Sequence, residues 1–389
     1  MFTQSINVLN FKYYLYSILT IFFQFLFLAF LKEFEHFNKY IEIFSLSIIL
    51  VGSFGSIQFY FIKEKNQLIG LKINNSFKIF FLLIVSVSFI YYLYHDIKFG
   101  LFYLSSIILG LITIYQGAVY ANMNYGYYNS RFILLVASFK FLLLLIFALF
   151  SNNIFVVLIY TNLIIIFIWV VFYYKSTLFE KNGYSILGAT NTMIGGSISS
   201  VDKIIVSNLY QNLSINYYLI FRVSSILQII GEILFRNERF VITSKNKNIK
   251  FKNIFFKILT LIFFIIASSY ILKFSHYTTF LLDVEFINNF FMIISKFYLE
   301  YIVITFAILI NSISGLFYDY IYSYYGNKNL IFINFLSFIL LIVLLLNFVT
   351  NLTSLCLIFL LIQSITLVLL IFLNLFIKKN EGKFSRKKP

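Results

Sequence analysis

Residues 354–377 read SLCLIFLLIQSITLVLLIFLNLFI, an apolar run without a charged side chain. A helix rises about 1.5 Å per residue, so a run of this length crosses the roughly 30 Å hydrocarbon core of a bilayer. Similar runs fill the chain, in which 61% of the 389 residues are hydrophobic and 11% are charged. The mean hydropathy of +0.92 is far outside the range of soluble domains. The sequence therefore predicts a multi-pass integral membrane protein.

Polar breaks divide the chain into twelve predicted spans. They lie near residues 11–31, 41–62, 77–94, 100–122, 132–150, 153–174, 184–208, 213–235, 252–273, 296–318, 329–349 and 354–377. The runs are continuous and about twice the length of a barrel strand, which favours helices over a membrane β-barrel. The first run is too long for a signal-peptide core and has no small-residue cleavage site after it, so we expect it to stay as a span. The expected fold class is all-α.

Lysine and arginine are concentrated on every second loop. One set of alternate loops is rich in them, for example the segments 245–257 and 378–388. The other set of alternate loops holds few, such as Lys39 and Lys98. Because positively charged loops stay in the cytoplasm, the pattern predicts that both termini are cytoplasmic. A missed span would invert every later loop, so the alternation also favours twelve spans. Orientation and attraction to anionic lipid headgroups explain the net charge of +16 better than nucleic-acid binding does.

The loop between spans six and seven divides the chain into two sets of six helices. We expect an N-terminal six-helix lobe over 1–175, a cytoplasmic linker over 176–183, a C-terminal six-helix lobe over 184–378 and a basic cytoplasmic tail over 379–389. Two bundles around a central site suit a carrier, and two complete lobes suit a monomer.

Span seven is the least hydrophobic and contains two adjacent charges, Asp202 and Lys203. A charge near the bilayer centre costs roughly 2.5–3.5 kcal/mol on insertion scales, so each should face water or a partner. Neighbours on a helix point about 100° apart, and we therefore expect that these two do not neutralise each other. Asn191 and Ser199 share the polar faces of this span. For its serines and glycines, close helix packing is the simpler explanation.

Span eight has a polar stripe on one face. Tyr218, Arg222, Ser225 and Glu232 recur in it at helical spacing, with Arg222 near mid-membrane and Glu232 near the inner surface. Lys140 in span five also lies near mid-depth.

Three cations, Lys140, Lys203 and Arg222, are thus predicted to surround one hydrated chamber that attracts an anionic group. Static ion pairs, such as Asp202 with Arg222, are the alternative.

The segment SISSVDKIIVSNLYQNLSINYYLIFRVSSI resembles spans seven and eight of bacterial polysaccharide flippases of the Wzx type. In that family an aspartate–basic pair precedes an aromatic Tyr-Tyr stretch and a later basic residue. Asp202 and Lys203 match the pair, Tyr217 and Tyr218 match the aromatics, and Arg222 matches the later cation. The chain departs from the family in having no proline in any span, since its single proline is Pro389.

This resemblance implies membership of the superfamily that also holds MATE-type exporters, with two six-helix lobes that rock to give alternating access. The substrate would be a polyprenyl-pyrophosphate-linked oligosaccharide, an O-antigen or capsule repeat unit, moved from the inner to the outer leaflet of the bacterial cytoplasmic (inner) membrane. A polysaccharide polymerase is a candidate partner.

Cations and hydrogen-bond donors suit a pyrophosphate in a low-dielectric cavity. The candidate substrate-binding residues are Arg222, Lys203, Lys140, Tyr218, Ser199, Asn191 and Ser225, and the candidates for ion coupling are Asp202 and Glu232. No phosphate-binding glycine loop or metal-ligand cluster occurs, so we expect no direct use of ATP. For a transporter of this kind we expect no catalytic residue, metal or cofactor.

Two alternatives stay open. A drug or small-molecule exporter would share the fold, which cannot separate the two activities. A membrane-embedded polysaccharide polymerase, ligase or glycosyltransferase would need acids, histidine or arginine on sizeable outer loops. The available loops, with Glu33, Glu35 and His36 or within 274–295, are short for that role.

Overall fold

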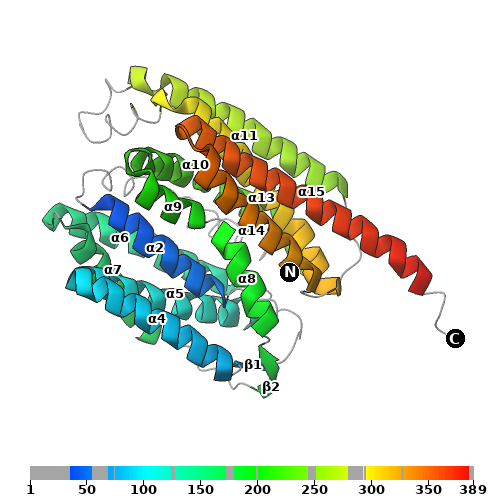
Figure 1. The fold of residues 1–389 in the computed structure, drawn as a ribbon, viewed down its shortest axis with the longest axis horizontal. Helices are drawn as coiled ribbons and strands as arrows, with labels where there is room; N and C mark the ends of the chain where they lie inside the picture. The colour runs from blue at the N-terminus through cyan, green and yellow to red at the C-terminus, as the bar shows by residue number, and fades with distance from the viewer. Residues whose placement is uncertain are drawn as a thin grey trace, which may run out of the picture. The chain divides into compact units, whose positions relative to one another are not determined.

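A computed structural model describes most of the chain. The described residues are 36–54, 69–73, 75–123, 128–151, 153–171, 179–184, 186–198, 200–243, 251–278, 292, 295–325 and 328–384. They are almost entirely helical, as the sequence predicts (Figure 1). The first predicted span lies outside these residues.

The described residues form helices and two short strands. In order they are α2 (Phe37–Gly52), β1 (Ile69–Ile73), α4 (Asn75–His95), α5 (Ile97–Met123), α6 (Tyr128–Phe150), α7 (Ile154–Val171), β2 (Phe179–Tyr184), α8 (Ile186–Ile198), α9 (Val201–Leu209), α10 (Gln211–Thr243), α11 (Phe251–Thr278), α13 (Tyr298–Tyr325), α14 (Lys328–Phe348) and α15 (Leu352–Phe384).

Seven of the described helices contain segments long and apolar enough to cross a membrane. These segments are Lys78–His95, Ile97–Ile114, Ile154–Val171, Ile254–Ile271, Tyr298–Ile321, Leu330–Phe348 and Leu352–Phe376. Large apolar side chains are exposed along them, for example Val87 on α4 and Phe263 on α11, as expected for faces that contact lipid. The chain is therefore a multi-pass membrane protein. Twelve spans and cytoplasmic termini stay predictions.

The chain packs as two compact units that divide between Ile215 and Asn216, inside α10. In unit 1, on the N-terminal side, α8 and α9 both pack against α2. In unit 2, on the C-terminal side, α13 packs against α15, α14 and α11. The predicted division into two six-helix lobes at residues 176–183 stays a prediction.

Four predicted outer loops meet at one end of unit 1. The His36 and Phe99 rings lie edge to face with centroids 6.0 Å apart, and Phe99 lies 4.6 Å from Phe155. The Ser214 hydroxyl donates to the side-chain oxygen of Asn38. These contacts join the starts of α2, α5, α7 and α10, so these four helices begin at the same end of unit 1.

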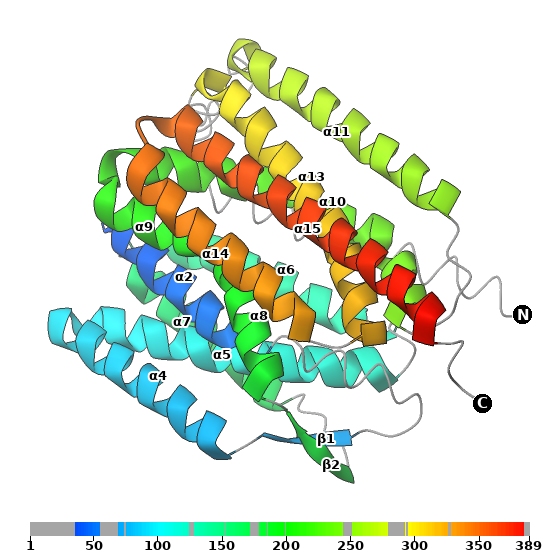
Figure 2. The ribbon, with the colours of Figure 1, turned by 45° about the vertical axis from the view of Figure 1, so that its right-hand side comes forward.

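At another place in unit 1, two predicted inner loops are joined by strands. β1 and β2 pair in parallel, with Ile69 opposite Phe179, and lie side by side where α4 and α8 begin (Figure 2). These strands differ from the all-α fold that the sequence predicts. β2, which reads FEKNGY, lacks the alternating apolar pattern that marks a strand, and in β1, IGLKI, that pattern is only five residues long. A pairing between segments this far apart also depends on where the helices bring them.

A glycine permits the close approach of α2 and α5. A Cβ atom at Gly110 would lie 2.7 Å from Cγ2 of Val51, closer than carbon atoms can pack. Small residues at helix contacts are the usual means of tight packing in lipid. Next to this contact, Leu109, Val136, Ile165 and Trp169 form a buried apolar cluster that links α5, α6 and α7.

Hydroxyl groups link the helices of unit 2. Thr305 on α13 donates to Ser224 on α10 over 3.1 Å, and Thr366 on α15 donates to Ser337 on α14 over 2.9 Å. Hydrogen bonds of this kind between helices are a common source of association in membranes.

The prediction of one continuous helix over 184–208 is wrong. That segment forms two helices, α8 and α9, and Ser200 stands before α9 with φ of −134°. The sequence before the break, GGSISS, is rich in glycine and serine, which are poorer helix formers than the apolar residues around them. The polar faces inferred from continuous helical spacing therefore do not extend from α8 into α9.

Candidate functional site

Asp202 and Lys203 form a buried ion pair in α9. The Lys203 Nζ atom lies 3.1 Å from each carboxylate oxygen of Asp202, and the two residues are 0% and 5% exposed. The expectation that they do not neutralise each other is therefore wrong. The Cβ atoms do point apart, but the flexible four-carbon stem of lysine lets its ammonium group fold back over the neighbouring carboxylate.

The position of this pair explains how a polar break is tolerated within apolar helices. Asp202 lies in the first turn of α9, where a negative charge interacts favourably with the helix dipole. An ion pair buried in this way is much less costly than either charge alone. For these two residues the geometry matches the static-pair alternative, with Lys203 in place of Arg222 as the partner.

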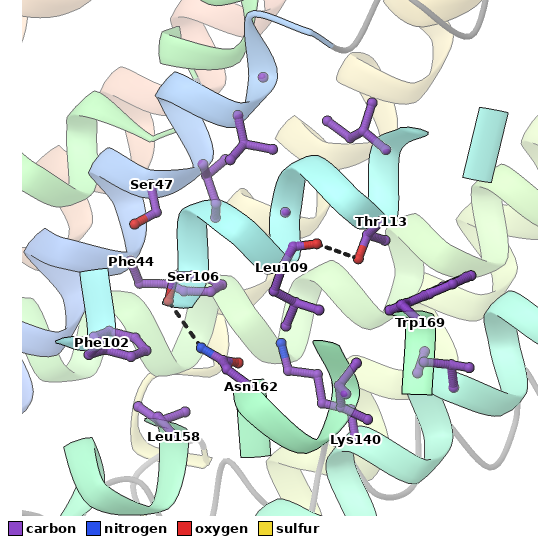
Figure 3. Close-up of a pocket in the computed structure, with 18 residues that line it drawn as sticks. Phe44, Ser47, Phe102, Ser106, Leu109, Thr113, Lys140, Leu158, Asn162 and Trp169 are labelled. Atoms are coloured by element: carbon purple, nitrogen blue, oxygen red, sulfur yellow. Dashed lines mark hydrogen bonds between the residues drawn. The ribbon is translucent and has the colours of Figure 1, made fainter. Parts of the chain in front are cut away.

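Unit 1 contains a cavity of about 420 Å³ between α2, α5, α6 and α7. Most of its wall is apolar, with Phe44, Leu109 and Trp169 among the lining residues (Figure 3). The volume is within the roughly 300–1,000 Å³ of small-molecule sites.

Lys140 brings a cation to this cavity. Its side chain extends from α6 into the space and its amine end points toward Leu109 (Figure 3). The residue is partly exposed, so its ammonium group can be hydrated within the cavity. Lys140 thus lines this cavity, and Lys203 is not among its lining residues.

Asn162 supplies an amide from α7, another of the helices that line this cavity. It is 2% exposed, and its nitrogen donates to the hydroxyl groups of Ser105 at 3.1 Å and Ser106 at 3.3 Å on α5. These bonds hold the amide at the wall beside Ser106. Sequence reasoning did not select Asn162, although Thr161 and Asn162 are the only strongly polar pair within the apolar run of α7.

This arrangement suits an amphiphilic molecule with an anionic group. The apolar wall can contact a hydrocarbon portion, while the Lys140 ammonium can bind an anionic oxygen and the Ser106 hydroxyl can donate to a second oxygen. The Asn162 amide donates to Ser105 and Ser106 and so offers its oxygen as an acceptor. Within the described part of the chain, no group of three or more histidine, cysteine, aspartate or glutamate side chains gathers as a metal site.

In unit 2, Arg222 is held against Tyr218. Its Nε atom donates to the Tyr218 hydroxyl over 2.9 Å, and its guanidinium carbon lies 5.0 Å from the centre of that ring. The Ser225 hydroxyl donates to the Arg222 carbonyl over 2.6 Å. The predicted stripe on α10 thus forms a local contact group, in which the buried Tyr218 orients the guanidinium group.

The other predicted site residues are less informative. Asn191 is fully buried in α8. Ser199 lies outside the described residues, as does the side chain of Glu232. Arg222 belongs to unit 2, and Lys140 and Lys203 belong to unit 1. Convergence of all three cations on one chamber stays a prediction.

Comparison with models of known protein families gives no match, and comparison with curated proteins gives none.

Proposed function

We propose that the protein is a flippase that moves a polyprenyl-pyrophosphate-linked oligosaccharide from the inner to the outer leaflet by alternating access. A bacterial cytoplasmic membrane location, twelve helices in two six-helix bundles and cytoplasmic termini belong to this proposal. The observation that carries it is the cavity of unit 1, in which a mostly apolar wall is combined with the ammonium group of Lys140 and the hydroxyl of Ser106.

The chemistry of that substrate matches this cavity. A lipid-linked pyrophosphate must leave the headgroup region and pass a low-dielectric layer, where its charge needs cations and hydrogen-bond donors. Lys140 supplies a cation beside α5 and α7, whose segments Ile97–Ile114 and Ile154–Val171 are long and apolar enough to cross a membrane. Arg222, held by Tyr218, is a second candidate for the pyrophosphate. The substrate role of Lys203 is weakened by its ion pair with Asp202.

An exporter of amphiphilic drugs is the second candidate. The apolar part of the cavity wall favours it, because such a surface binds many hydrophobic compounds. The two functions differ in the anionic and sugar portions of the cargo, and these can be varied in an experiment.

Purified protein reconstituted in vesicles tests the proposal. The probe is a polyprenyl-pyrophosphate trisaccharide with a fluorophore on its sugar, and dithionite in the medium quenches the outer leaflet only. Fluorescence should fall to about half in protein-free vesicles and almost completely in vesicles that contain the protein. Labelled phosphatidylcholine should stay half protected. Equal loss for both lipids, or transport of ethidium without movement of the glycolipid, would contradict the proposal.

A further inference from the structure

A second pocket lies at the end of unit 1 where the predicted outer loops meet. It has a volume of about 480 Å³ and is formed by the start of α2, the end of α9 and the start of α10. Its wall contains three amide side chains, those of Asn38, Asn208 and Gln211, together with Lys39 and Glu42. It shares no lining residue with the cavity between α2, α5, α6 and α7.

The charges of this pocket neutralise each other. The Lys39 Nζ atom lies 3.1 and 3.0 Å from the carboxylate oxygens of Glu42. The same carboxylate accepts a hydrogen bond of 3.0 Å from the Tyr92 hydroxyl. One lysine and one glutamate thus contribute no net charge, in a chain with a net charge of +16. Such a pocket is a poor match for phosphate, which would have to compete with Glu42 for the ammonium group.

The amides supply both donors and acceptors at the rim. Asn208 is exposed, and its nitrogen donates to the Ile204 carbonyl over 2.9 Å, which leaves its oxygen as an acceptor. Asn38 accepts from the Ser214 hydroxyl and keeps its two N–H donors. Gln211 is exposed at the first turn of α10. Neutral groups that both donate and accept match hydroxyl groups, which do the same.

An aromatic edge and a backbone outlier border the same pocket. His36 has φ of 59° and ψ of 26°, a left-handed conformation that costs energy for a residue with a side chain. It is exposed and packs against Phe99, while Phe37 is buried beside it. Conformations of this kind are concentrated at ligand sites, where the surrounding structure holds them.

We propose that this pocket binds a neutral saccharide through its hydroxyl groups. Asn38, Asn208 and Gln211 would bind neighbouring hydroxyls, and the Lys39–Glu42 pair would offer a fixed donor and acceptor. The inference rests on the proposed function only for the source of the sugar, which would be the glycan of the transported lipid. A free saccharide has the same chemistry, and the experiment separates these two sources.

Saturation-transfer-difference NMR on the full chain in detergent tests the binding. The probes are maltose, lactose and N,N′-diacetylchitobiose as neutral sugars, with inorganic pyrophosphate as an anionic competitor. At least one neutral sugar should give transfer that pyrophosphate does not displace. The double variant Asn208→Ala/Gln211→Ala loses two hydrogen-bonding groups and should raise the Kd of that sugar about tenfold or more.

Asn347→Ala is the matched control. Asn347 is also exposed, and its nitrogen donates to the carbonyl four residues earlier over 2.7 Å, as Asn208 does at 2.9 Å. This variant should leave the Kd unchanged. The proposal is overturned if no neutral sugar binds, if pyrophosphate displaces the sugar, or if the double variant binds like the parent protein.

The vesicle assay then shows whether the bound sugar is the lipid-linked glycan or a free saccharide. It also tests the proposed function and the proposed pocket independently of each other. Slower movement of the glycolipid in the double variant indicates the lipid-linked glycan, and unchanged movement with lost sugar binding indicates a free saccharide. Sugar binding without any glycolipid movement would refute the proposed function alone. Glycolipid movement without sugar binding would refute the pocket alone.

Discussion

At the scale of single residues, Lys140 is the cation whose surroundings match a transport role best. Lys140→Ala should slow translocation of the labelled glycolipid about 10- to 100-fold, because a hydrogen bond to a charged group contributes about 1.5–3 kcal/mol. Lys140→Arg, which keeps the charge, should retain much of the rate. Lys98→Ala, at an exposed lysine, serves as the control. Equal rates for Lys140→Ala and the parent would remove the residue from the account.

The ion pair of Asp202 with Lys203 leads to a second prediction. Asp202→Asn or Lys203→Met alone should destabilise the protein by about 3–5 kcal/mol, because each leaves a buried charge without its counterion. The double variant should recover most of that loss. Thermal unfolding of the four proteins in detergent measures the coupling. Strictly additive effects would mean that the pair contributes no coupling energy.

These residues also show the limits of sequence reasoning. Tyr218 and Arg222 were placed on one face by their spacing, and the structure shows a hydrogen bond between their side chains. The pairing of Asp202 with Lys203 was missed, because backbone geometry predicts the direction of a Cβ atom and not the path of a long side chain. Asn162 was missed because no other polar residues recur with it at helical spacing along α7, so no polar stripe marked its position.

At the scale of elements, the contact of α2 with α5 depends on Gly110. Gly110→Ala should destabilise the protein by about 1–3 kcal/mol, the usual cost of overpacking, because the new Cβ would meet Val51 at 2.7 Å. Adding Val51→Ala should restore stability, since it removes the atoms in the way. Gly52→Ala is the matched control on α2, where a Cβ meets nothing within 4 Å. Unfolding temperatures that do not separate Gly110→Ala from Gly52→Ala would contradict this packing.

Hydrophobic run length predicted the helices well, because each apolar run must satisfy its own backbone hydrogen bonds in lipid. It did not predict the break between α8 and α9, since apolar residues continue on both sides of the GGSISS segment. The pairing of β1 with β2 was equally hidden. β1 alternates apolar residues over only five positions and β2 does not alternate, so their contact depends mainly on how α4 and α8 are placed.

At the scale of the whole molecule, the charge pattern predicts which loops face outward. Cys356 is fully buried, so single cysteines can be introduced against a low background. Asn208→Cys should react with an impermeant maleimide from outside intact cells. Lys181→Cys, in the predicted inner segment of β2, should react only after the membrane is opened. The opposite pattern would invert the predicted orientation.

We propose that the cavity between α2, α5, α6 and α7 holds the lipid-linked glycan during transport. A photoactivatable polyprenyl-pyrophosphate glycolipid, cross-linked to the reconstituted protein and mapped by mass spectrometry, measures this directly. The account predicts adducts on cavity residues such as Leu109 and Trp169, which unlabelled glycolipid should suppress. Adducts confined to the lipid-facing sides of α4 and α11, and unaffected by competitor, would contradict it.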